Sequence, residues 1–146
     1  MRYLDEIIVH CTATNPSWMA DAPVEDIVKE VTRWHTDPKP HGRGWSDCGY
    51  HFIISRSGEI GAARPLERVG AHCKGKNKGT VGVALCGGRG ASANDKFEEH
   101  FTVEQDKALR TLIARLQKDY PDIDMITAHQ DYAPKACPGF IVEEWL

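Results

Sequence analysis

Short apolar runs rich in β-branched residues alternate along this chain with stretches of helical periodicity, and that alternation restricts the possible folds most strongly. Such runs predict strands at Glu6–His10, Tyr50–Ser55, Val81–Cys86 and Asp124–His129. The third run lacks polar alternation, which is typical of a strand in the middle of a sheet. Strands that alternate with helices predict an α/β fold with a central mixed β-sheet flanked by α-helices.

Two longer segments carry the helical pattern. The first starts near Asp21 and should stop before Asp37, because the following proline disfavours helix at the residue that precedes it. The second opens at Thr102–Gln105, which matches a capping box, and closes at Tyr120. Residues Phe140–Leu146 have the length for one short terminal helix.

Length and composition indicate one globular domain. The chain has 146 residues, of which 41% are hydrophobic and 27% charged, so we expect a single monomeric domain over residues 1–146. The formal net charge is −3, whereas nucleic-acid-binding domains usually carry a basic excess, so no nucleic-acid partner is expected. No apolar run has the length of a membrane span or of a signal peptide, so no membrane insertion is expected.

Histidines at the ends of two predicted strands indicate a metal site. His10 and His129 would lie at carboxyl ends of strands, where α/β folds commonly bind ligands. Cys137 follows across a loop with two prolines, which can bring the thiol back toward His129. Two imidazoles and a thiolate suit a catalytic zinc ion, which takes three protein ligands and keeps one position open.

Spacing alone leaves other ligand pairs open. Cys48 lies three residues before His51, and His72 adjoins Cys73. An odd number of cysteines, five, argues against a disulfide framework, so most should be buried thiols. The remaining histidines have no evident partner and are interpreted as surface or core residues: His35, His41 and His100.

Five blocks of sequence occur in order from about Glu6 to the C-terminus. They are Val9–Thr14 (VHCTAT), Trp45–Phe52 (WSDCGYHF), Ala71–Val83 (AHCKGKNKGTVGV), Ala128–His129 (AH) and Ala133–Phe140 (APKACPGF). Together these blocks resemble the phage-lysozyme branch of the N-acetylmuramoyl-L-alanine amidases. Their ordered coverage of nearly the whole chain argues against a chance match.

The resemblance implies a fold shared with peptidoglycan recognition proteins, a central sheet with helices packed on it. It also implies that His10, His129 and Cys137 hold zinc, and that Tyr50 and Lys135 are catalytic residues beside the metal. From the residues alone, Tyr50 can equally be a core residue of its strand and Lys135 a solvated lysine. Recognition proteins that only bind peptidoglycan commonly lack the ligand at Cys137, so its presence favours an enzyme over the alternative, a non-catalytic recognition module.

The resemblance further implies that His72 helps to bind substrate. Lys74 and Asn77 lie in the same polar loop, and we expect both to contact the peptide stem, whose carboxylates suit a lysine. Two features depart from the family pattern. The loop Thr36–Gly44 is longer and richer in proline, which can alter the stem peptides that fit. We also expect no separate wall-binding module.

The implied reaction is zinc-dependent hydrolysis of the amide between N-acetylmuramic acid and L-alanine in bacterial peptidoglycan or its fragments. Zinc would activate water, while Tyr50 and Lys135 would stabilise the charge that develops on the carbonyl oxygen. The implied role is that of a phage or prophage endolysin, made in the host cytoplasm and released to the cell wall by another protein. A recycling amidase is a close variant, and a structural zinc site in an interaction protein is a third possibility.

Overall fold

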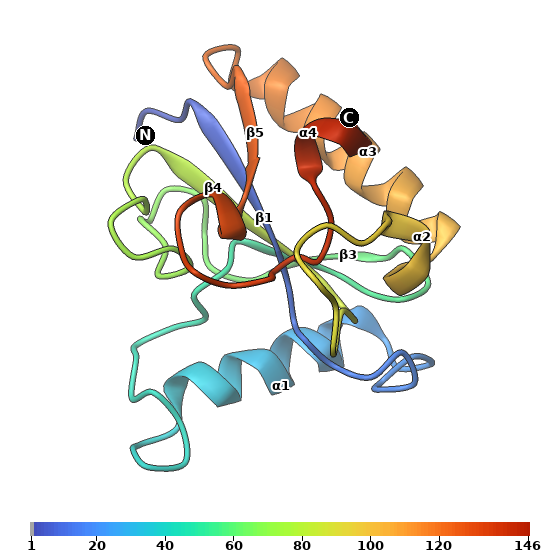
Figure 1. The fold of residues 1–146 in the computed structure, drawn as a ribbon. Coiled ribbons are helices and arrows are strands. Elements are labelled where there is room, and N and C mark those ends of the chain that lie inside the picture. The colour runs from blue at the N-terminus through green and yellow to red at the C-terminus, as the bar shows by residue number, and fades with distance from the viewer. Residues whose placement is uncertain (1) are drawn as a thin grey trace.

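The computed structural model describes residues 2–146, which form a five-stranded mixed sheet with helices on both faces (Figure 1). The strands are β1 (Glu6–Cys11), β2 (Phe52–Ile54), β3 (Ile60–Ala62), β4 (Thr80–Leu85) and β5 (Met125–Ala128). Their order in the sheet is β3-β2-β4-β1-β5, and only β2 and β3 pair antiparallel. The continuous apolar run therefore does become the central strand, β4.

Helices cover the two faces unequally. They are α1 (Val24–Thr36), α2 (Phe97–His100), α3 (Val103–Asp119) and α4 (Val142–Trp145), with a 3-10 helix η1 (His129–Asp131) after β5. Helix α1 lies on one side of the sheet, and the other α-helices lie on the opposite side (Figure 1). Within residues 2–146, no helix is both long and apolar enough to cross a bilayer.

Alternation along β1 separates a core face from a polar face. Ile7, Val9 and Cys11 belong to the core cluster that also contains Leu109 and Phe140, on the side of α3. The intervening residues point the other way because successive side chains of a strand alternate between its faces. They are Glu6, Ile8 and His10, and all three are buried. Helix α1 packs its own cluster against the strands at the β2 side of this second face.

The capping box and the end of α1 agree with the sequence patterns. The amide of Gln105 donates to Thr102 Oγ1 over 3.0 Å, and the amide of Thr102 donates to Gln105 Oε1 over 3.0 Å. Two strands are shorter than predicted, because β2 begins only at Phe52 and β5 ends at Ala128. Helix α2 was not predicted, since a single turn is too short to show periodicity.

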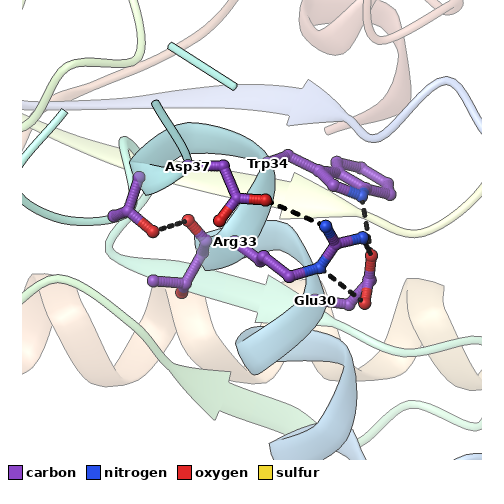
Figure 2. A network of polar contacts seen from close by, with 6 residues as sticks. Glu30, Arg33, Trp34 and Asp37 are labelled. Atoms are coloured by element: carbon purple, nitrogen blue, oxygen red, sulfur yellow. Dashed lines mark hydrogen bonds and ion pairs between the residues drawn. The ribbon is translucent and has the colours of Figure 1, made fainter. Parts of the chain in front are cut away.

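A polar network fastens the C-terminal end of α1 (Figure 2). Arg33 donates hydrogen bonds to Glu30 and to Asp37, and its Nη1 lies 2.9 Å from Asp37 Oδ2. The indole nitrogen of Trp34 donates to Glu30 Oε1 over 3.1 Å. The predicted loop follows, and the amide of Trp45 bonds back to the last turn of α1 over 2.9 Å. The end of the loop is thereby held against the C-terminal turn of α1.

Candidate active site

His10 and His129 are brought together by the parallel pairing of β1 with β5. Val9 pairs with Ala128 in the register, so the next residue of each segment lies at the same edge of the sheet. The ring centroids of the two histidines are 4.6 Å apart. His129 opens η1 and does not end a strand as predicted, but the two histidines do meet at the carboxyl edge of the sheet.

Cys137 returns to this edge through the loop that follows η1. The backbone amide of Gln130 donates to the carbonyl of Cys137 over 2.9 Å, and its side-chain amide donates to the carbonyl of Phe140 over 2.8 Å. The amide of Cys11 donates to Cys137 Sγ over 3.1 Å. These contacts hold the thiol at the end of β1, beside His10.

These three side chains form the one group in residues 2–146 whose ligand atoms can share a metal ion. The atoms of His10, His129 and Cys137 all lie within 4.8 Å of one another. Burial lowers the pKa of both histidines, and the nearby Lys135 ammonium adds to that effect, so both imidazoles are neutral and keep a lone pair. The side-chain contact with the Cys11 thiol and burial raise the pKa of Cys137 in the metal-free protein, whereas a bound cation would favour the thiolate.

Tyr50 lies just before β2, at the same edge as the metal-ligand candidates. Its ring centroid is 5.2 Å from that of His10. Burial raises the pKa of the phenol, so the hydroxyl keeps its proton at neutral pH and can donate a hydrogen bond.

A cleft of about 740 Å³ opens over these groups. His129, Tyr50 and Lys135 all line it, so one candidate ligand and both candidate catalytic residues face one space. This volume lies in the usual range for sites that take small molecules. Arg43 and Lys74 also line the cleft, and none of the described residues that line it is acidic. The cleft is therefore positive and suits a ligand with carboxylates.

The three residues predicted to bind substrate lie on one wall of this cleft: His72, Lys74 and Asn77. Burial lowers the pKa of His72 to about 3, so its ring is neutral. Asn77 Oδ1 accepts hydrogen bonds from the amides of His72 and Cys73, each over 2.9 Å. Lys74 is exposed. The structure thus gathers all three residues, although it gives Asn77 a role in holding the wall itself.

The sequence patterns do not single out four further residues of the cleft: His35, Arg43, Trp45 and Tyr132. The sequence shows no evident partner for His35, and in the structure its Nδ1 accepts a hydrogen bond from the amide of Gly49 over 2.9 Å. The helical periodicity of α1 does indicate that His35 is buried, because His35 follows Val31 by four residues on the buried face of the helix. The loop residues carry no such signal, since their positions depend on the path of the loop.

The alternative ligand pairs do not form a metal site among residues 2–146. The ring of His51 is occupied, because Nδ1 accepts from the amide of Gly82 over 3.1 Å and Nε2 donates to the carbonyl of Arg68 over 2.9 Å. Cys48 is buried in the cluster beneath α1. All five cysteines are free thiols and only Cys137 is not fully buried, which confirms the prediction of mostly buried thiols.

Comparison with known proteins agrees with this geometry. The family model for N-acetylmuramoyl-L-alanine amidase matches residues 1–140. The endolysin of Klebsiella phage KP32 is 42% identical over 140 residues, covering 96% of this chain and 83% of the relative.

Two solved structures are similar. N-acetylmuramoyl-L-alanine amidase LysC from Clostridium intestinale superposes with a TM-score of 0.68 at 28% identity, covering 99% of this chain and 83% of the other. Drosophila PGRP-LB, a peptidoglycan recognition protein, superposes with a TM-score of 0.75 at 23% identity, covering 98% of this chain and 80% of the other. The second likeness confirms the expected fold alone. Because the family model spans nearly the whole chain and every block that carries it lies in the described fold, the chain belongs to the N-acetylmuramoyl-L-alanine amidase family and is an enzyme of that class.

Proposed function

We propose that this amidase depends on zinc and hydrolyses the amide between N-acetylmuramic acid and L-alanine in bacterial peptidoglycan, as a phage or prophage endolysin. One observation carries the proposal: the ligand atoms of His10, His129 and Cys137 lie within 4.8 Å of one another, and His129 lines a cleft together with Tyr50 and Lys135. A site that only binds wall fragments has no need for a thiol and two neutral imidazoles at that distance.

The donor set suits zinc rather than a harder cation. Imidazole and thiolate are preferred zinc ligands, and calcium and magnesium prefer oxygen. Three protein donors leave one position for substrate or water, as in catalytic zinc sites. When bound, zinc would supply a Lewis acid for the scissile carbonyl and would lower the pKa of water to near 7.

The remaining chemistry falls to Lys135 and Tyr50. Negative charge develops on the carbonyl oxygen when water adds, and a positioned ammonium and phenol can stabilise it. Lys135 supplies the positive charge, and Tyr50 supplies a hydroxyl that keeps its proton because burial raises its pKa. The same hydroxyl can relay a proton: it passes its own to the departing amine of L-alanine and takes up the one that the attacking water releases.

The cleft wall recognises the peptide stem in this proposal. Stem peptides carry carboxylates, and the positive lining of the cleft attracts them. Lys74 offers an exposed ammonium for an ion pair. His72 and Asn77 contribute the surface of the wall, and both already use polar atoms in bonds within the protein.

The place of action follows from the proposed substrate. The endolysin of Klebsiella phage KP32 is the kind of relative expected for an enzyme that reaches the wall from within an infected cell. We propose that this protein, made in the host cytoplasm, likewise acts as a monomer on the wall or its fragments once another protein has opened the membrane.

Mass spectrometry of purified peptidoglycan after incubation with the protein tests the proposal. Stem peptides with a free N-terminal alanine should be released, and a zinc chelator should abolish their release. Retained binding to the wall without release would favour the alternative of a recognition module. Release that persists in chelator would contradict the zinc requirement and leave the amidase class intact.

A further inference from the structure

His10 and His72 share a hydrogen bond in the interior of the protein. His10 Nε2 lies 2.8 Å from His72 Nδ1, and the two rings are nearly perpendicular, at 86°. The two residues are only 1% and 7% exposed, so no water can easily replace this bond. In such a pair one nitrogen must carry the proton and the other must accept it.

The hydrogen bonds of Thr80 decide which nitrogen of His72 carries its proton. Thr80 Oγ1 lies 2.7 Å from the carbonyl oxygen of Lys76, 3.2 Å from that of Asn77 and 3.1 Å from His72 Nε2. A carbonyl can only accept, so the single hydroxyl proton is directed to a carbonyl, with Lys76 the nearer. His72 Nε2 must then donate to Thr80 Oγ1, which leaves His72 Nδ1 unprotonated.

The same assignment of donors and acceptors determines the tautomer of His10. Because His72 Nδ1 can only accept, His10 Nε2 must be the donor of their hydrogen bond. His10 Nδ1 is then the nitrogen with a free lone pair. A metal-binding histidine commonly donates its other N–H to a protein acceptor in this way, and the acceptor fixes both ring orientation and tautomer.

Gly82 and Asn77 hold His72 in the position from which it accepts the hydrogen bond of His10. A Cβ atom added at Gly82 of β4 would lie 2.4 Å from His72 Cγ, so the ring occupies the space that any other residue at that position would fill. Asn77 Oδ1 fixes the backbone of His72 through two amides. With both ring nitrogens engaged, His72 has no free nitrogen with which to bind substrate.

We propose that His72, held by Thr80, is a positioning residue that sets the tautomer of His10 and thereby presents His10 Nδ1 to the catalytic cation. The inference rests on the proposed function, since it assumes that His10 is a ligand. It gives His72 a role in metal binding beyond its place on the wall of the cleft.

Zinc affinity of the full chain, measured by competition with a chromophoric chelator, tests the inference. His72→Ala removes the acceptor and should weaken zinc binding about 10- to 100-fold, the usual effect of losing such a partner. Thr80→Val keeps the shape but removes the hydroxyl, and should weaken binding in the same direction. Thr80→Ser keeps the hydroxyl and lacks only the methyl group, so it should bind zinc with wild-type affinity. If Thr80 acted only through the packing of its methyl group, Thr80→Ser would also bind zinc more weakly. If His72→Ala does not fold, the comparison of Thr80→Val with Thr80→Ser still tests the inference.

Cys137→Ser separates the inference from the proposed function. If zinc binds equally well to wild type and Cys137→Ser, the metal site is wrong, and both proposals fall. If Cys137→Ser loses zinc while His72→Ala and Thr80→Val keep wild-type affinity, the inference alone is overturned. An increase in KM with unchanged zinc affinity in His72→Ala would likewise overturn it, since that result identifies a substrate contact.

Discussion

The backbone amide of Cys11 donates a hydrogen bond to the sulfur of Cys137 over 3.1 Å, across 126 positions of sequence. An amide donor stabilises a thiolate, because hydrogen bonds to the charged form of a group favour that form. The contact also fixes the sulfur at the end of the strand that carries His10. Cys137 is therefore the proposed ligand whose removal gives the clearest result.

Cys137→Ser should abolish zinc binding and amidase activity while the fold is kept. The α/β core does not contain the metal, so far-UV circular dichroism of the variant should match that of wild type. Zinc content after dialysis and release of stem peptides are the measurements. Cys86→Ala, which removes a buried thiol away from the cleft, is the control and should retain zinc. Full activity in Cys137→Ser would rule out this ligand.

Tyr50→Phe should reduce kcat on the order of a hundredfold, because one preorganised donor to the developing oxyanion is lost. KM should change much less, since the ring and its packing remain. Zinc affinity should stay at the wild-type value, because Tyr50 is not a ligand. Steady-state kinetics on soluble wall fragments separate these quantities, and an unchanged kcat would remove Tyr50 from the catalytic residues.

Stability of the metal-free protein should fall as the pH drops below the ordinary histidine pKa of 6.5. Burial, with help from nearby arginines, lowers the pKa of His35 to about 4, and burial lowers that of His51 to about 4. Between pH 6.5 and 4 the unfolded chain binds protons that the folded chain does not. Each such group then removes up to about 1.4 kcal/mol of unfolding free energy per pH unit.

Urea unfolding in chelator from pH 7 to pH 4 measures this dependence. His35→Asn keeps an acceptor for the amide of Gly49 but does not titrate, so its stability should depend less steeply on pH. A wild-type stability that is flat across this range would contradict the lowered pKa values.

Gly82→Ala should destabilise the protein and weaken zinc binding, because the new Cβ would lie 2.4 Å from His72 Cγ and must displace the ring. Overpacking of this kind costs about 1–3 kcal/mol. In the double variant Gly82→Ala/His72→Ala the clash is relieved, so its loss of stability should be smaller than the sum of the single losses. Denaturant unfolding of the three variants tests this coupling, and simple additivity would show that the ring and the glycine do not compete for space.

Local patterns predict the elements of this fold well, and they predict its contacts less well. The capping box at Thr102 and Gln105 depends on four consecutive residues, so the sequence alone predicts it. Both of its hydrogen bonds are present in the structure. The central place of β4 follows from its unbroken apolar run. The turn that makes His129 the first residue of η1 depends on the bond of Asp131 Oδ2 with the amide of Ala128, and no periodicity reveals it.

In the candidate site too, sequence patterns predict the residues better than they predict the contacts between them. Chain order and the strand ends pointed to His10, His129 and Cys137 as one set, and resemblance to a family selected it from several. The pairing of His72 with His10 spans 62 positions and depends on the register of β4 with β1, so spacing does not indicate it. The contributions of Arg43 and Trp45 to the cleft depend on how far a loop returns toward the sheet.

The alternation along β1 has a consequence for folding. Glu6 and His10 lie on the polar face of the strand, where the carboxylate of Glu6 accepts a hydrogen bond from Thr127 over 2.6 Å. A shift of β1 by one residue against its neighbours would turn both side chains into the apolar cluster under α3. Each would lose its partners there, and burying such groups without partners costs several kcal/mol. The two polar residues of this face thus also discriminate against a misaligned sheet, so errors in strand alignment are disfavoured before any metal or substrate is bound.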